Sequence, residues 1–200
     1  QICKVAYLDD LQAFDCPASL VINYDFCVDE SFYTKADCVL TGCAYTPLRE
    51  QFADQPYHLW EQAKDLFLST GGTDPFYIAG GMLKRLCASD DWKDVSFHVL
   101  TGPMHVHRAE LAVMAEKDSR IVLHEQVSDM AALMSTCDLA FSAGGTTLYE
   151  LCAVGVPSVS FSMADNQLPG VKAFDDANLI PWAGDIRDNE IFYDDAVEKL

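Results

Sequence analysis

Short apolar runs alternate with helix-period segments over the last two thirds of this chain, and this alternation limits what it can fold into. Five apolar runs lie at residues 65–69, 95–100, 120–123, 138–142 and 158–161. Between the later runs, apolar residues recur at the spacing of one helix face, as in Ile78, Met82 and Leu86. These runs are apolar on both faces, as strands buried in a parallel sheet are. Strand–helix alternation of this kind predicts βαβ units. From about Glu61 onward we therefore expect a complete Rossmann-like α/β domain of five strands and at least four helices.

The first sixty residues differ from the rest. They hold three strand-like runs, at 4–8, 19–23 and 38–42, with little helix between them. We interpret them as the remaining part of an N-terminal Rossmann-like domain and expect the passage between domains at Tyr45 to Tyr57. The predicted domains are residues 1–56 and 57–200. Because the chain starts at Gln1 without Met, we expect the first domain to be truncated.

Charge and cysteine usage exclude several classes of partner. The formal net charge is -18, from 13 Lys and Arg against 31 Asp and Glu, and so acidic a chain repels nucleic acid and anionic membranes. No apolar run approaches the roughly 18 residues needed to cross a bilayer. The 8 cysteines form no CxxC pair and several lie in apolar runs, which indicates reduced thiols in a cytoplasmic protein. An incomplete domain would expose apolar surface, so we note a homodimer as a possible partner state.

A glycine-rich loop follows the run at 65–69. Gly71 and Gly72 allow a sharp turn that exposes backbone amides, and Asp74-Pro75 resembles a helix N-cap followed by proline at the first helical position. Exposed amides at a helix start form an anion site suited to a phosphate or diphosphate. The alternative is a tight turn without a ligand.

A second glycine loop follows the run at 138–142. Gly144 and Gly145 precede a helix-period segment in which Thr147 and Glu150 have the spacing of a capping box. Glu150 could therefore satisfy the backbone at Thr147, or it could accept hydrogen bonds from a ribose, as acidic residues do in dinucleotide-binding folds. Two such loops at neighbouring strand ends favour nucleotide binding.

Polar residues follow the run at 158–161. Asp165, Asn166 and Gln167 are three consecutive hydrogen-bonding side chains, and a helix is expected to open at Ala164 or Asp165. A plain cap needs only one of them. We therefore interpret them as recognising a hydroxyl-rich ligand.

The segment after 120–123 is less distinctive. Ser128 or Asp129 is expected to cap the next helix. The backbone near Val127 could contact the edge of a base.

Other candidates are weaker. His105 and His107 form an HxH pair without an apparent third ligand, so we expect no metal site. His98 is interpreted as structural. Asp9-Asp10 ends a strand and could face a cleft, although acidic strand ends are common in so charged a chain.

The motifs follow one another along the chain at residues 71–75, 127–131, 142–151, 155–157 and 164–167. Together they resemble the C-terminal domain of the UDP-sugar hydrolases of pseudaminic-acid biosynthesis, relatives of spore-coat polysaccharide biosynthesis proteins. More distantly they resemble the N-acetylglucosaminyltransferase of peptidoglycan lipid II synthesis. Residues 42–49 are similar to the segment that precedes the interdomain crossing. The resemblance implies a GT-B architecture, with a UDP-sugar held between two Rossmann-like domains.

The resemblance also implies roles for individual residues. Glu150 would bind the ribose, Val127 and Met130 would lie at the uracil, and Asn166 would act in catalysis. The predicted diphosphate cradle is Gly71, Gly72, Thr73, Gly144, Gly145, Thr146 and Thr147, and the predicted sugar contacts are Asp165, Asn166 and Gln167. Water would attack the anomeric carbon and release UDP, in surface-glycan or nonulosonic-acid biosynthesis. No cofactor or metal is implied, because amides and helix dipoles would hold the diphosphate.

One departure from the family concerns the catalytic base. The family begins with a GxGHxxR loop whose histidine would serve as general base, and nothing before Asp9 supplies it here. We therefore expect weak UDP binding and little hydrolysis by these 200 residues. Two alternatives stay open: a GT-B glycosyltransferase that uses a UDP-sugar, and a non-catalytic nucleotide-sugar-binding module.

Overall fold

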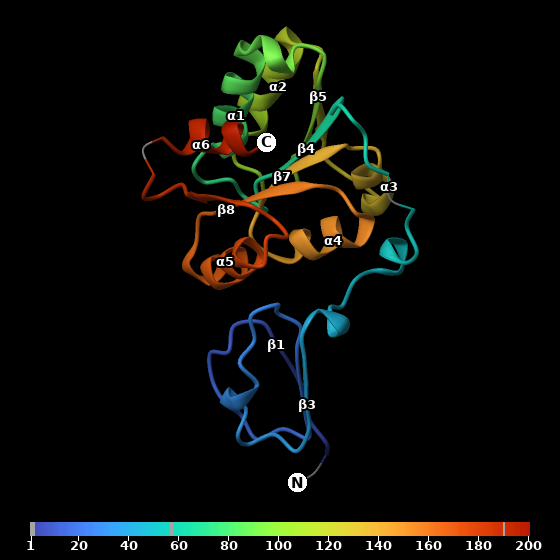
Figure 1. The fold of residues 1–200 in the computed structure, drawn as a ribbon, viewed down its shortest axis with the longest axis vertical. Coiled ribbons are helices and arrows are strands. Elements are labelled where there is room, and N and C mark those ends of the chain that lie inside the picture. The colour runs from blue at the N-terminus through green and yellow to red at the C-terminus, as the bar shows by residue number, and fades with distance from the viewer. Residues whose placement is uncertain (1–2, 57, 190) are drawn as a thin grey trace.

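The chain forms two parallel sheets, one small and one large (Figure 1). The computed structural model describes residues 3–56, 58–189 and 191–200, so Tyr57, the end of the predicted passage, lies outside the described residues. The small sheet has the order β1-β2-β3. Its strands are β1 (Ala6–Asp9), β2 (Leu20–Asn23) and β3 (Val39–Thr41). All three coincide with the apolar runs predicted as strands.

The large sheet has six strands in the order β6-β5-β4-β7-β8-β9. They are β4 (Asp65–Ser69), β5 (Ser96–Leu100), β6 (Ile121–His124), β7 (Leu139–Ala143), β8 (Ser158–Ser162) and β9 (Trp182–Asp185). Numbered from β4, this order is 3-2-1-4-5-6, that of the Rossmann dinucleotide-binding fold. The prediction of five strands is wrong by one, because β9 is only four residues long and includes Gly184.

Helices cover both faces of the large sheet. The core on one face includes residues of α1 (Ile78–Ala88), α2 (Arg108–Lys117) and α6 (Phe192–Lys199). The core on the other face includes residues of α3 (Met130–Ser135), α4 (Thr146–Val154) and α5 (Leu168–Asp176).

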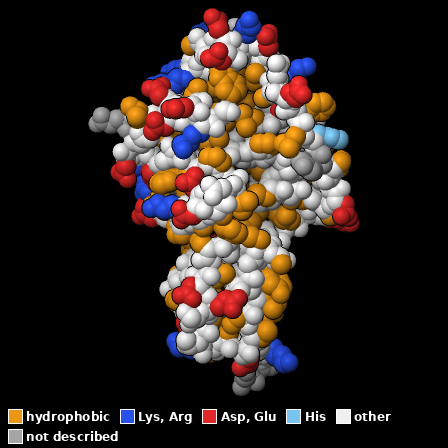
Figure 2. All heavy atoms as spheres, viewed as in Figure 1, with side chains coloured by type: hydrophobic (Ala, Val, Ile, Leu, Met, Phe, Trp, Pro, Cys, Tyr) orange, Lys and Arg blue, Asp and Glu red, His pale blue; other side chains and the backbone are white. Residues whose placement is uncertain are grey.

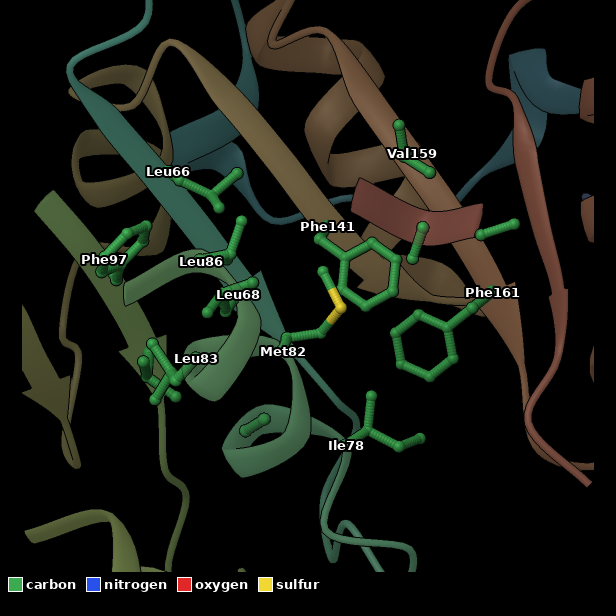
Figure 3. Close-up of a cluster of buried hydrophobic side chains, with 14 of the residues drawn as sticks. Leu66, Leu68, Ile78, Met82, Leu83, Leu86, Phe97, Phe141, Val159 and Phe161 are labelled. Carbon is green, nitrogen blue, oxygen red and sulfur yellow. The ribbon is translucent and has the colours of Figure 1, made fainter. Parts of the chain in front are cut away.

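Side-chain alternation along β4 explains the two cores. Leu66 and Leu68 point to the α1 side (Figure 3), whereas Phe67 points to the α3–α4 side. All three are fully buried, so the strand must be apolar on both faces, as its sequence predicts. Among the described residues, no helix is long and apolar enough to span a bilayer.

A crossing segment with two short 3-10 helices, η2 (Cys43–Tyr45) and η3 (Glu50–Phe52), joins the small sheet to the large one. The two units also touch directly: Phe26 stacks on Phe174 with ring centroids 5.0 Å apart. Tyr149 of α4 adds polar contacts, because its hydroxyl accepts from the Phe26 amide at 3.0 Å and donates to Asp25 Oδ1 at 3.1 Å. Figure 2 shows hydrophobic side chains where the smaller unit meets the larger. The small sheet is therefore docked on α4 and α5, as Figure 1 also shows.

Candidate functional site

The two glycine loops leave the large sheet at neighbouring positions. β4 and β7 are paired, with Ser69 opposite Ser142 at their ends. From β4 the chain proceeds to one side of the sheet and from β7 to the other, so the loops lie at the topological switch point. Ligands of open α/β sheets bind at such points, beyond the carboxyl ends of the strands. The fold thus brings both loops to the same edge of the sheet.

The N-terminus of α1 is already occupied by a carboxylate. Asp74 is fully buried, and its two oxygens accept from the amides of Ile78 at 2.8 Å and Ala79 at 3.0 Å. His105 Nε2 lies 3.5 Å from Asp74 Oδ2. Because α1 begins at Ile78, the placement of Pro75 at the first helical position is wrong; Asp74 reaches the helix from a preceding turn. This helix end therefore holds its own anion.

The N-terminus of α4 is open. Its N-cap is Gly145, which has φ 147° and provides no side-chain cap. No hydrogen bond from the amides of Gly145, Thr146 or Thr147 occurs among the described residues. Unpaired amides at a helix start, together with the helix dipole, attract an anion.

Gly144 has no room for a side chain. A Cβ there would lie 2.6 Å from Val171 Cγ1 and 3.1 Å from Gln167 Cβ. The β7–α4 turn therefore packs directly against α5 and the loop before it, and this close approach requires glycine.

Glu150 does not form the capping box. Thr147 lies inside α4 and not at its N-cap, so the alternative in which Glu150 caps Thr147 is wrong. Glu150 Oε1 instead accepts from Arg49 Nη2 at 3.0 Å, and the Glu150 side chain is 18% exposed. The carboxylate is thus held one turn below the open end of α4.

The loop after β8 lies against both glycine loops. A Cβ on Gly71 would lie 3.0 Å from Met163 Cε, and Gln167 Oε1 accepts from the Met163 amide at 2.9 Å. Asp165 opens a 3-10 helix (Asp165–Gln167) that leads into α5, and its carboxylate pairs with Arg187 at 2.8 Å.

A cleft between the two units contains part of the predicted site. One wall is formed by predicted residues of the large unit: Gly144, Gly145, Thr146, Asn166 and Gln167. Asp10, Tyr24 and Asp25 of the small unit line the other wall. The enclosed volume is about 100 Å³, below the roughly 300–1,000 Å³ of sites that bury a whole small molecule. A nucleotide-sugar would therefore occupy the cleft with only part of its length.

The other eight predicted residues do not line this cleft: Gly71, Gly72, Thr73, Val127, Met130, Thr147, Glu150 and Asp165. Gly71, Gly72 and Thr73 are exposed on the first loop. Val127 and Met130 are half-buried at the start of α3. Residues of the second and third motifs thus line the cleft, whereas residues of the first and fourth do not.

The small unit makes its wall of the cleft acidic. Asp25 is held by the Tyr149 hydroxyl, and burial raises the pKa of its carboxyl, with the nearby charges of Asp10 and Asp9 acting in the same direction. No histidine lines the cleft among the described residues. Carboxylates therefore face the open end of α4.

Several residues of this site were not predicted from the sequence. Tyr24 and Asp25 carry no local motif, and only the packing of the two units brings them to the cleft. Tyr149 and Arg49 lie within segments that carry the family resemblance, but the sequence assigns them no role. Asp10 carries a weak signal in the sequence, as part of the acidic strand end Asp9-Asp10, and it lines the cleft.

Sequence comparison finds a relative that is named for polysaccharide biosynthesis, and an uncharacterized one. No model of a protein family matches this sequence. The chain is 33% identical over 129 residues to the spore coat polysaccharide biosynthesis protein SpsG of Bacillus subtilis, a match that covers 63% of this chain and 37% of that protein. An uncharacterized protein of Methanocaldococcus jannaschii is 28% identical over 102 residues, covering 50% of this chain and 21% of the relative. The chain thus spans well under half the length of these relatives.

Structural comparison finds glycosyltransferases. The glycotransferase of kitacinnamycin has a TM-score of 0.61 at 18% identity, covering 91% of this chain and 46% of that one. The spinosyn rhamnosyltransferase SpnG, solved with thymidine diphosphate, has a TM-score of 0.56 at 17% identity, with 91% and 47% covered. Arabidopsis thaliana UGT89C1, solved with UDP-L-rhamnose, has a TM-score of 0.61 at 11% identity, with 98% and 59% covered. The chain is therefore homologous to the spore coat polysaccharide biosynthesis protein SpsG and has the GT-B-like fold of the glycosyltransferases, the relationship that its motifs predict.

Proposed function

We propose that this chain carries the nucleotide-binding part of an enzyme that hydrolyses a UDP-activated acetamido sugar, with water attacking the anomeric carbon and UDP leaving. The observation that carries the proposal is the open N-terminus of α4, which faces the cleft at the switch point of the sheet. Neutral amides and a helix dipole bind a diphosphate without basic side chains. This suits a chain with a formal net charge of -18.

The predicted residues fit this proposal in the following way. The amides of Gly145, Thr146 and Thr147 hold the diphosphate, and the loop of Gly71, Gly72 and Thr73 lies beside it. Glu150 accepts from the ribose hydroxyls, and the backbone from Val127 to Met130 faces the uracil. Asn166 and Gln167 contact the sugar, Asn166 orienting the attacking water, while Asp165 fixes their loop through Arg187.

A glycosyltransferase that uses the same UDP-sugar is the second candidate. It is favoured by the solved structures of similar fold, which are glycosyltransferases by name. The two reactions share the nucleotide site and differ in what attacks the anomeric carbon. A non-catalytic nucleotide-sugar-binding module would share the site as well.

Calorimetry and product analysis separate these functions. We expect UDP to bind, and UDP-N-acetylglucosamine to release free sugar slowly without an acceptor, since no described histidine lines the cleft. Release that requires an added acceptor would indicate a transferase, and binding without release in either case would indicate a binding module. Absence of UDP binding would refute the proposal.

A proline substitution tests the α4 amides directly. Thr146 is the first residue of α4, where a helix tolerates proline, so Thr146→Pro removes one amide donor without breaking the helix. A lost hydrogen bond to a charged group costs about 1.5–3 kcal/mol, so we expect UDP affinity to fall by at least about tenfold. Thr146→Ala is the control, because it keeps the amide and loses only the hydroxyl. Equal affinities of the two variants would contradict a diphosphate at this helix end.

A further inference from the structure

Part of the crossing segment, residues 49–52, contacts both elements that the proposed function assigns to the nucleoside. Arg49 Nη2 donates to Glu150 Oε1 at 3.0 Å, and its guanidinium lies 5.2 Å from the centre of the Phe52 ring. Two residues later, Gln51 Oε1 accepts from the amides of Met130 at 2.6 Å and Ala131 at 3.2 Å. One short segment is thus bound to α4 and to the start of α3.

Phe52 fixes this segment in place. It is 3% exposed and belongs to the core that includes α3 and α4. Burial of an aromatic ring stabilises by about 1.5–3 kcal/mol, so residues 49–52 are anchored as part of the large unit. Arg49 and Gln51 therefore start from a fixed backbone and lose little freedom when they contact α4 and α3.

The contact with Arg49 leaves the Glu150 carboxylate able to accept hydrogen bonds from two neighbouring hydroxyl groups. A carboxylate has about four acceptor positions, and Arg49 uses one oxygen, Oε1. No hydrogen bond to Oε2 occurs among the described residues. The Arg49 charge also offsets a carboxylate that would otherwise stand beside an anionic ligand.

We propose that Arg49 and Gln51 are positioning residues for the nucleoside half of the ligand. Arg49 orients the Glu150 carboxylate toward the two ribose hydroxyls. Gln51 holds the start of α3 so that the backbone before Met130 faces the base. The inference rests on the proposed function, but it assigns these two side chains no contact with the diphosphate.

A double-mutant cycle tests the part played by Arg49. UDP affinity is measured by calorimetry for Arg49→Met, Glu150→Gln and the double variant. If Arg49 acts through Glu150, each single change lowers UDP affinity about tenfold and the double variant is no weaker than the weaker single one. The preference for UDP over 2′-deoxy-UDP falls in all three variants, whereas pyrophosphate affinity stays unchanged. Gln51→Met is expected to weaken UDP and uridine alike.

The chain offers a matched control. Arg85 pairs with Asp194 at 3.0 Å and lies 4.9 Å from the centre of the Tyr193 ring. It repeats the contacts of Arg49 with residues that do not line the cleft. Arg85→Met should leave UDP affinity unchanged. Arg49→Lys keeps the charge without the planar guanidinium and should fall between wild type and Arg49→Met, which preserves the test if Arg49→Met unfolds.

The outcomes separate this inference from the proposed function. If the unaltered chain binds no UDP, both are overturned. If it binds UDP and the effects of the two single changes add, or Arg49→Met binds UDP normally, only the role of Arg49 is overturned. Loss of pyrophosphate affinity in Arg49→Met would also overturn it, because Arg49 would then act on the diphosphate.

Discussion

Single residues decide which helix end is open to a ligand. At α1 the Asp74 carboxylate satisfies two amides and places a buried negative charge at the helix start. At α4 the N-cap is Gly145, which has no side chain to compete with a ligand. The two glycine loops resemble each other in sequence. Only the second leaves the positive end of its helix dipole without a negative side chain beside it.

Gly144 provides a residue-scale prediction. A methyl group there would meet Val171 Cγ1 at 2.6 Å and Gln167 Cβ at 3.1 Å, neither of which is the free end of a long side chain. Overpacking of this kind costs about 1–3 kcal/mol, so Gly144→Ala should lower the free energy of unfolding by that amount in urea denaturation. Gly170 of α5 is the control: apart from its chain neighbours and the backbone of its own helix, no described atom lies within 4 Å of a Cβ added there. Because alanine favours helices by about 0.5–1 kcal/mol over glycine, Gly170→Ala should stabilise the chain.

At the scale of elements, the contact between His105 and Asp74 in the turn before α1 predicts that the free energy of unfolding depends on pH. Burial lowers the pKa of His105 below its usual 6.5, although the Asp74 charge acts in the opposite direction. The folded chain therefore binds this proton less readily than the unfolded chain does. The contribution of the uncharged His105 to stability is fully present above pH 6.5. It is lost as pH falls from 6.5 to the pKa of His105 in the folded chain, with a slope of at most about 1.4 kcal/mol per pH unit.

His105→Gln checks this assignment. Stability is measured by urea denaturation between pH 5 and 8, a range above the usual titration of carboxyl groups. The variant should show a smaller loss of stability below pH 6.5 than the wild type. Some loss remains, since burial also lowers the pKa of His124. Identical slopes in the two chains would show that His105 does not cause the effect.

The sequence predicts elements well where each one carries its own signal. All eight apolar runs are strands, and Asp129 caps α3 as expected. The sequence prediction lacks β9 and α6. β9 is short and contains Gly184, whereas α6 carries a helix-spaced apolar pair, Phe192 and Ala196, that the prediction overlooks. Roles within the site depend on distant contacts. Tyr149 and Phe26 are 123 residues apart in the chain, and no local pattern predicts that they meet.

For the whole molecule, the cleft exists only because two units meet. Its acidic wall comes from loop residues of the small unit, Asp10 and Asp25, and its amide wall comes from the large unit. The small unit has a minor core of Ala18, Val21 and Tyr33, while two larger cores flank the large sheet. Most of the stability should therefore reside in the large unit. The division at 1–56 and 57–200 stays a prediction, and the burial of Phe52 in the core that includes α3 and α4 favours a boundary before residue 49.

Two fragments test this division and the place of the crossing segment. Residues 58–200 and residues 46–200 both contain the six-stranded sheet, so both should unfold cooperatively. Only the longer one keeps Phe52, which is 3% exposed, and the Gln51 contacts with α3. We expect the longer fragment to be more stable by about 1.5–3 kcal/mol, with Phe52→Ala abolishing most of the difference. Equal stability would mean that the crossing segment is not part of the large unit, and failure of the shorter fragment to fold would move the boundary before Phe52.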